Sequence, residues 1–285
     1  MSAVPCSLVR SLFAPCLCLL WGCGQVAVAG GSGGGVGSGG VGSGGAGSGG
    51  ADAPSGGAGT GGSGDDTGCD AAEIQDAGLQ SAIKDQLGLD ESAPLDPARF
   101  GDITSLFASG VAELEGLSCL SSLTGLTLTE SPLLVDLGPL EGVPQLTSLQ
   151  LTEVGADDFT AVSRLRKLRA VGILASPLSS LDPLAALPSL ELLSVVRVPV
   201  SDLAPLVGSD SLLTVTASHT QVTTLEPLLA WEHPPLTLTV TDSPLDDAVF
   251  EEQIPALVEQ GFCVVTGVEG TTVEHPLDCV PPDKP

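Results

Sequence analysis

The sequence predicts an α/β solenoid: a right-handed coil of about six short parallel strands, joined by 3₁₀ or short helical return segments and capped at both ends. One observation is a repeat of 22 or 23 residues between residues 123 and about 245, with apolar side chains three and five positions after each start. Another is a set of further apolar positions near offsets ten, thirteen and sixteen. This is the pattern of a leucine-rich repeat, whose units bury their apolar faces only against one another. The starts fall at Leu123, Leu146, Leu168, Leu190, Leu212 and Pro235.

Residues 1–22 are interpreted as a lipoprotein signal peptide. Arg10 is the only charge in the first fifty residues, and the apolar run 11–21 is too short to span a bilayer as a mature helix. The run ends in Leu-Trp-Gly-Cys, which resembles a bacterial lipobox, so Cys23 is the expected lipidation site and membrane anchor. With Gly24 after the Cys, an outer-membrane or cell-surface lipoprotein is favoured. The alternative is a protein secreted after cleavage behind Ala29.

Residues 23–68 are expected to form the lipidated Cys and a flexible tether. Segment 30–64 consists almost wholly of Gly, Ser, Ala, Val and Thr. Such a segment cannot bury enough apolar surface to offset its chain entropy. Roughly 40 such residues reach on the order of 35 Å, which suits a domain held away from a membrane.

The repeats occupy residues 123–250 of the predicted domain. Segment 69–122 is expected as an N-terminal cap, with a helix near Leu79, Ile83 and Leu87, which recur at helical spacing. Segment 251–285 is expected as a C-terminal cap and tail. There, a helix over 246–257 precedes a strand over 261–266 that covers the open end of the stack.

Four cysteines remain outside the signal peptide and the lipidation site. An even number in an exported domain suggests two disulfides, for which three pairings exist. Because two cysteines precede the repeats and two follow them, pairs Cys69–Cys119 and Cys263–Cys279 would each close one end of the solenoid. No spacing of cysteines and histidines suggests zinc.

Within each return segment, an acidic residue is followed by Pro, as in 181–184 and 202–206. The carboxylate can accept backbone N–H groups at the start of a short helical turn, and Pro lacks the N–H that would be left without a partner there. The sequence therefore predicts 3₁₀ or short helical turns opposite the strands.

The repeats, together with segments 100–106 and 110–117 before them, closely resemble the internalin family over residues 75–250. The resemblance implies a cell-surface, protein-binding solenoid with an N-terminal cap. At the turn position where that family carries Asn, this chain has no Asn, and Ser and Thr replace it only in part. The turns at the two Val positions are therefore expected to be the least regular. The series runs Ser131, Val154, Ser176, Val198, Thr220, Ser243.

Composition excludes several classes of function. The net charge is −26, with nine Lys and Arg against 35 Asp and Glu. This balance argues against nucleic acid and against unassisted binding to anionic lipid. No catalytic or phosphate-binding motif is present in a strand–turn–helix context, so the protein is not expected to be an enzyme or to hold a cofactor. Calcium bound by clustered carboxylates is a weak alternative.

Recognition is expected at the residues directly after the strands, named here the edge column. The outward residues of the six expected strands are rich in Thr and include no aromatic side chain, and they cover about 300–400 Å², less than half of a standard interface side. The basic run 164–169 is interpreted as pairing with local carboxylates, and the end of the edge column as a ladder of surface charges. The edge column runs Glu130, Glu153, Ala175, Arg197, His219, Asp242.

The sequence thus favours a non-enzymatic recognition or adhesion module whose partner is a protein or glycan outside the cell. The alternative is an acidic structural component of an envelope or coat, with calcium-dependent self-association.

Overall fold

The computed structural model describes residues 69, 73–232, 237–268 and 271–275. These residues all belong to one compact unit, which runs from Gly62 to Pro285. Cys23, the tether and Cys279 lie outside the described residues. Among the helices that are described, none has the length and apolar character needed to cross a membrane.

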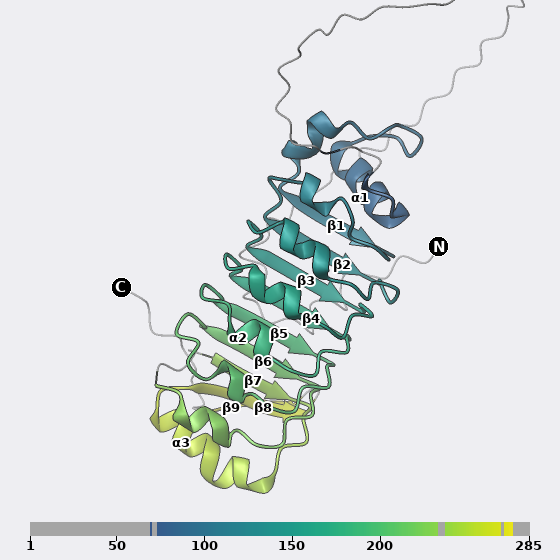
Figure 1. The fold of residues 1–285 in the computed structure, drawn as a ribbon. Coiled ribbons are helices and arrows are strands. Elements are labelled where there is room, and N and C mark those ends of the chain that lie inside the picture. The colour runs from purple at the N-terminus through teal and green to yellow at the C-terminus, as the bar shows by residue number, and fades with distance from the viewer. Residues whose placement is uncertain (1–68, 70–72, 233–236, 269–270, 276–285) are drawn as a thin grey trace, which may run out of the picture. The chain divides into compact units, whose positions relative to one another are not determined.

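The described residues form a stack of turns with one continuous sheet along its side (Figure 1). The sheet has nine strands, which follow one another in chain order. Strands β1 to β8 are parallel, and β9 pairs antiparallel with β8. The predicted parallel solenoid is confirmed: β2 to β7 are the six expected strands, β8 is the strand expected over 261–266, and β1 adds a strand that was not expected. The bounds are β1 (Ser105–Ser109), β2 (Gly125–Thr129), β3 (Ser148–Thr152), β4 (Ala170–Leu174), β5 (Leu192–Val196), β6 (Thr214–Ser218), β7 (Thr237–Thr241), β8 (Cys263–Val268) and β9 (Thr271–His275).

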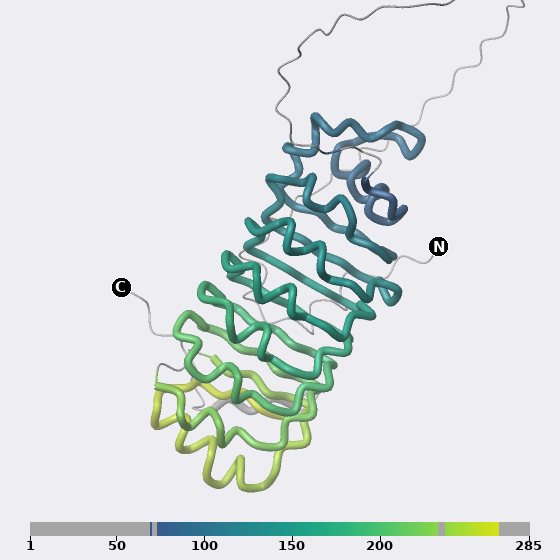
Figure 2. Tube along the Cα trace, in the orientation of Figure 1, coloured from purple at the N-terminus to yellow at the C-terminus, as the bar shows by residue number. Residues whose placement is uncertain are grey.

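Short helical segments form the side of the stack opposite the sheet (Figure 2). All but α2 are 3₁₀ helices, and five of the seven carry Pro at their first or second position. Asp136 Oδ1 accepts the N–H of Gly138 at 2.7 Å, and Asp202 Oδ1 accepts that of Ala204 at 2.8 Å. The segments are η4 (Pro97–Asp102), η5 (Leu117–Cys119), η6 (Gly138–Gly142), η7 (Thr160–Arg164), α2 (Asp182–Ala185), η8 (Ala204–Leu206) and η9 (Glu226–Ala230).

The core consists of apolar rows that run along the stack, one residue from each turn. The register pairs residues at the same offset in adjacent strands, so each inward side chain lies between its two equivalents. Burying one such side chain contributes about 1.5–3 kcal/mol, and it stays buried only while its neighbours cover it. The row at offset three is at most 1% exposed and comprises Leu126, Leu149, Val171, Leu193, Val215 and Leu238.

The N-terminal cap is held to the stack by one carboxylate and one disulfide. Helix α1 (Ala77–Leu87) packs against β1, and its N-cap residue Asp76 accepts the N–H of Leu79 at 2.8 Å through one oxygen. The other oxygen accepts the N–H of Ala112 at 2.8 Å, in the loop after β1. Cys69 and Cys119 form the predicted disulfide, with a Cα–Cα distance of 5.5 Å.

The C-terminal end of the stack is covered by the helical segments η10 (Val249–Gln253) and α3 (Ile254–Glu259), followed by β8. Buried Phe262 lies edge-on to the Trp231 ring at a centroid distance of 6.2 Å. Cys263 is disulfide-bonded. Its expected pairing with Cys279 stays a prediction, because Cys279 lies outside the described residues.

The turns after the strands use serine hydroxyls of alternate repeats in place of an Asn ladder. Ser131 Oγ accepts the N–H of Val111 in the preceding turn at 3.0 Å, and Ser176 Oγ accepts that of Val154 at 3.2 Å. Each hydroxyl also donates to the carbonyl two residues before it. Val154 offers no side-chain acceptor, and the N–H of Ser131 in the preceding turn donates instead to the carbonyl of Glu153 at 3.1 Å, so this turn departs from the serine pattern. The expected irregularity at Val198 stays a prediction.

Candidate recognition surface

The edge column is a continuous row of residues in one unusual backbone conformation. All six have positive φ, between 48° at Glu130 and 55° at Arg197. The turn after β1 places Gly110 at the same point, with φ of 66°. For a residue with a Cβ this left-handed region costs roughly 1–2 kcal/mol, whereas glycine adopts it without that steric cost. Sequence reasoning found the column but not its conformation.

Hydrogen bonds between repeats fix the backbone of the column. The N–H of Ala175 donates to the carbonyl of Val196 at 2.9 Å, and the N–H of Arg197 donates to that of Ser218 at 3.0 Å. The same bond, from a column residue to the last strand residue of the next turn, recurs at Glu153 and His219, and Asp242 donates to the carbonyl of Gly267, one residue before the end of β8. Each side chain therefore leaves the edge of the sheet from an equivalent backbone position.

The charges along the column change from acidic to mixed. Glu130, Glu153 and Arg197 are exposed, whereas His219 and Asp242 are partly buried. His219 Nδ1 lies 3.8 Å from Asp242 Oδ2 and has no hydrogen-bond partner. The neighbouring Ser218 hydroxyl accepts a hydrogen bond from Thr241 Oγ1 at 2.9 Å, so it is not oriented by His219 as a catalytic nucleophile would be.

The outward face of the sheet, formed by the side chains that alternate with the buried rows, contains an aromatic residue outside the six expected strands. Strand β1 pairs with β2 so that Phe107 lies beside Thr127, and the Phe107 side chain is 62% exposed. Thr127 itself is only 4% exposed. The six expected strands, β2 to β7, carry no outward aromatic side chain, as expected, but β1 adds Phe107 at the N-terminal end of the same face. The signal was the alternation of residues 105–109, in which buried Leu106 and Ala108 force Phe107 outward.

Two further exposed apolar residues lie in the loop after β2. Leu133 is 74% exposed and Val135 is 64% exposed, while Leu134 between them is fully buried. The loop after β3 packs closely against this loop, since the carbonyl of Pro132 occupies the space where a side chain at Gly155 would begin. Leu133 and Val135 follow Glu130, the first residue of the edge column, within five positions of the chain.

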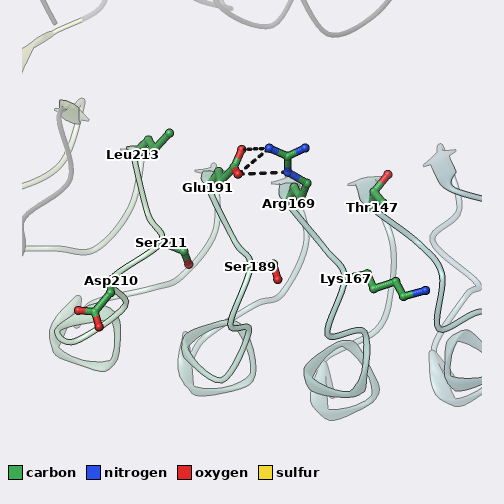
Figure 3. Close-up of a pocket in the computed structure, with 8 residues that line it drawn as sticks. All are labelled: Thr147, Lys167, Arg169, Ser189, Glu191, Asp210, Ser211 and Leu213. Atoms are coloured by element: carbon green, nitrogen blue, oxygen red, sulfur yellow. Dashed lines mark hydrogen bonds and ion pairs between the residues drawn. The ribbon is translucent and has the colours of Figure 1, made fainter. Parts of the chain in front are cut away.

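The opposite edge of the sheet, where the chain enters the strands, carries a hollow of about 560 Å³ (Figure 3). It lies between a row directly before the strands and a second row two residues earlier. Arg169 donates to both oxygens of Glu191, at 2.6 and 2.9 Å, which confirms the expected pairing for part of the basic run. The lining residues are Thr147, Lys167, Arg169, Ser189, Glu191, Asp210, Ser211 and Leu213.

The described residues bring one group of three possible metal ligands together, namely Cys69, Glu73 and Cys119. Both cysteines are committed to their disulfide, so this group does not offer thiolates to a metal.

One carboxylate at the start of a helical turn has a lowered pKa. Hydrogen bonds from the hydroxyl and the N–H of Thr160 hold the pKa of Asp158 below its ordinary value of 3.8. That exposed carboxylate caps the turn at η7 and is ionised at neutral pH.

Comparison with known proteins identifies the fold. No protein-family model and no curated protein sequence matches the chain. Among solved structures, it is similar to internalin C2 from Listeria monocytogenes, with 22% identity, a TM-score of 0.54, and coverage of 68% of this chain and 95% of that one. It is also similar to internalin F from the same organism, with 20% identity and a TM-score of 0.52, over 69% of this chain and 65% of that one. At this identity the likeness shows the leucine-rich-repeat solenoid alone.

Proposed function

We propose that this protein is a non-enzymatic, surface-anchored recognition module that binds a protein partner through its edge column. The observation that carries the proposal is the row of side chains retained at positive φ. Glycine would relieve the strain at each position and does so only at Gly110. Strained backbone positions that keep a side chain occur preferentially where the side chain has a function.

The geometry of the column suits recognition of an extended surface. Adjacent strands lie about 4.8 Å apart, so six successive column residues span on the order of 24 Å. Along that length the charge passes from Glu130 and Glu153 to Arg197 and His219. A charge pattern of this kind selects one partner and one orientation more strongly than a uniform polar sheet. Exposed Phe107 adds an aromatic side chain, a type that is enriched at protein interfaces.

Export and anchoring belong to the same proposal. The Cys69–Cys119 disulfide suits an oxidising compartment outside the cytosol. Lipidation at Cys23, with the Gly/Ser-rich segment as tether, would hold the solenoid at an outer membrane or cell surface, and cleavage behind Ala29 would release it instead. Cell-surface location also gives the column access to an external partner.

The test is capture of a partner by the full chain and by two variants. Replacing Arg197 and His219 together with Ala should weaken capture at least tenfold. The matched control replaces Thr216 and Thr239, on the outward face of the sheet, with Ala, and should change capture of the partner little. Arg197 is exposed and the other three residues are partly buried, so thermal unfolding of each variant checks that its stability is unchanged. If the Thr variant loses the partner while the Arg197/His219 variant keeps it, the site assignment is wrong.

A second candidate function is favoured by the hollow at the strand-entry edge. Lys167 and Ser189 have no hydrogen-bond partner among the described residues, and the hollow combines hydroxyl, carboxylate and cationic groups. Such a lining suits the many hydroxyls of a glycan. We propose testing it with a panel of defined oligosaccharides, comparing Lys167→Gln/Ser189→Ala with Arg166→Gln, which lies outside the hollow. Equal binding by both variants would exclude this site.

A further inference from the structure

Three of the four large apolar side chains that are most exposed in the described residues lie on the first two turns of the stack. They are Phe107, Leu133 and Val135, and the fourth is Phe250 near the C-terminal cap. Scattered exposed apolar residues need no explanation, but neighbouring ones on a strongly charged protein mark interaction sites. Leu133 and Val135 are the pair that shares one loop.

Leu133 and Val135 differ from the residues at the same position of every other turn. We align the turns on the buried residue that lies three or four places after Gly110 or after each edge-column position, namely Leu114, Leu134, Ala156, Leu178, Val200 and Val222. The position before that residue is Glu113, Gly155, Pro177, Pro199 or Gln221, and the position after it is Glu115, Asp157, Ser179, Ser201 or Thr223. The core therefore does not require apolar residues at 133 and 135, since the fold accepts polar or small ones there.

Carboxylates surround this pair. The preceding turn places exposed Glu113 and Glu115 at the equivalent positions, and the following turn places exposed Asp157 there. In the edge column, exposed Glu130 lies at the strand end of the pair's own turn, and exposed Glu153 lies at the strand end of the following turn. No Lys, Arg or His occurs between Arg99 and Arg164, so no basic residue of these turns neutralises them.

We propose that Leu133, Val135 and the carboxylates around them form a docking patch for a cationic, amphipathic segment of a protein partner. Aliphatic side chains of that segment would cover Leu133 and Val135, and its Lys or Arg residues would meet Glu113, Glu115 and Asp157. A second copy of this chain does not fit, because its equally acidic surface would be repelled. The inference rests on the proposed recognition function and specifies the chemistry of the partner at the acidic end of the edge column.

The test uses the full chain and a synthetic amphipathic peptide of Leu and Lys as probe, with affinity measured by fluorescence anisotropy. The informative variant is Leu133→Gln/Val135→Thr, which copies the residues of the turn at Gln221 and Thr223 and should therefore fold. It should lower affinity at least tenfold. The matched control, Phe250→Ser, removes an exposed apolar side chain outside the patch and should leave affinity within twofold.

Charge is tested separately with Glu113→Gln/Glu115→Gln against Glu251→Gln/Glu252→Gln, which changes the net charge equally at a distant site. The first variant should weaken binding and flatten its salt dependence, and the second should do neither. Equal effects of patch and control variants would reduce the interaction to general attraction by an acidic protein and overturn the proposal. Equally tight binding of a Leu–Glu peptide would also overturn it.

The outcome is separable from that of the proposed function. If the Leu133→Gln/Val135→Thr variant captures the partner as well as the unmodified chain while Arg197→Ala/His219→Ala does not, the patch is wrong and edge-column recognition stands. If neither variant affects capture, both assignments fail.

Discussion

Replacing Ala175 with Gly should stabilise the protein, although it removes a methyl group from a partly buried position. Ala175 has φ of 50°, and its N–H donates to the carbonyl of Val196 at 2.9 Å, so the repeat holds the residue in the left-handed region. Gly would remove strain of roughly 1–2 kcal/mol. It would also raise the entropy of the unfolded chain, which costs roughly 0.5–1 kcal/mol. The net expectation is a gain of up to about 1.5 kcal/mol.

The assay is urea unfolding with the disulfides intact, with the transition midpoint compared at constant m-value. The matched control is Ala170→Gly in the same repeat. Ala170 opens strand β4, where φ is not positive, so the same substitution there should destabilise by about 0.5–1 kcal/mol. A third variant, Ala175→Val, should destabilise more strongly, because a β-branched side chain is a severe outlier at positive φ. If Ala175→Gly destabilises the protein as Ala170→Gly does, the edge column is not strained and the argument from strain to function fails.

Three further expectations concern stability and export. Ser176→Ala should destabilise by about 1–3 kcal/mol in the same urea assay, because a buried turn N–H of the preceding repeat loses its acceptor. Replacing Cys69 and Cys119 with Ser should lower stability by about 4 kcal/mol, given the 50-residue separation that the disulfide closes; a loss below 1 kcal/mol would show that the cap folds independently of it. Cys23→Ser should abolish acyl labelling of the exported protein, whereas finding Gly30 as the natural N-terminus would contradict lipidation.

The candidate site could be predicted only in part. The edge column followed from counting beyond the strands, because residues at one offset of a regular repeat lie above one another. Phe107 was missed because β1 belongs to a shorter turn. Ile103, which corresponds to a repeat start, and Leu123, the next repeat start, are separated by fewer residues than the later repeat starts are from one another. Its phase becomes clear only when Leu106 pairs with Leu126 in the sheet. The exposed pair Leu133 and Val135 also needed this alignment, which shows that the other turns carry polar residues, Gly or Pro there.

The sequence by itself determined the solenoid, its handedness, its inward rows and the presence of caps, because apolar periodicity is a local property of the chain and each row has one stable burial arrangement. Only the tertiary structure decided which groups meet across repeats. Ser176 accepts the N–H of Val154 from 22 residues away, and Asp76 bonds to Ala112 across 36. The conformation of the edge column was decided in the same way, since its positive φ is held by hydrogen bonds to the next turn. Such contacts depend on the exact stacking of neighbouring turns, which composition and spacing do not encode.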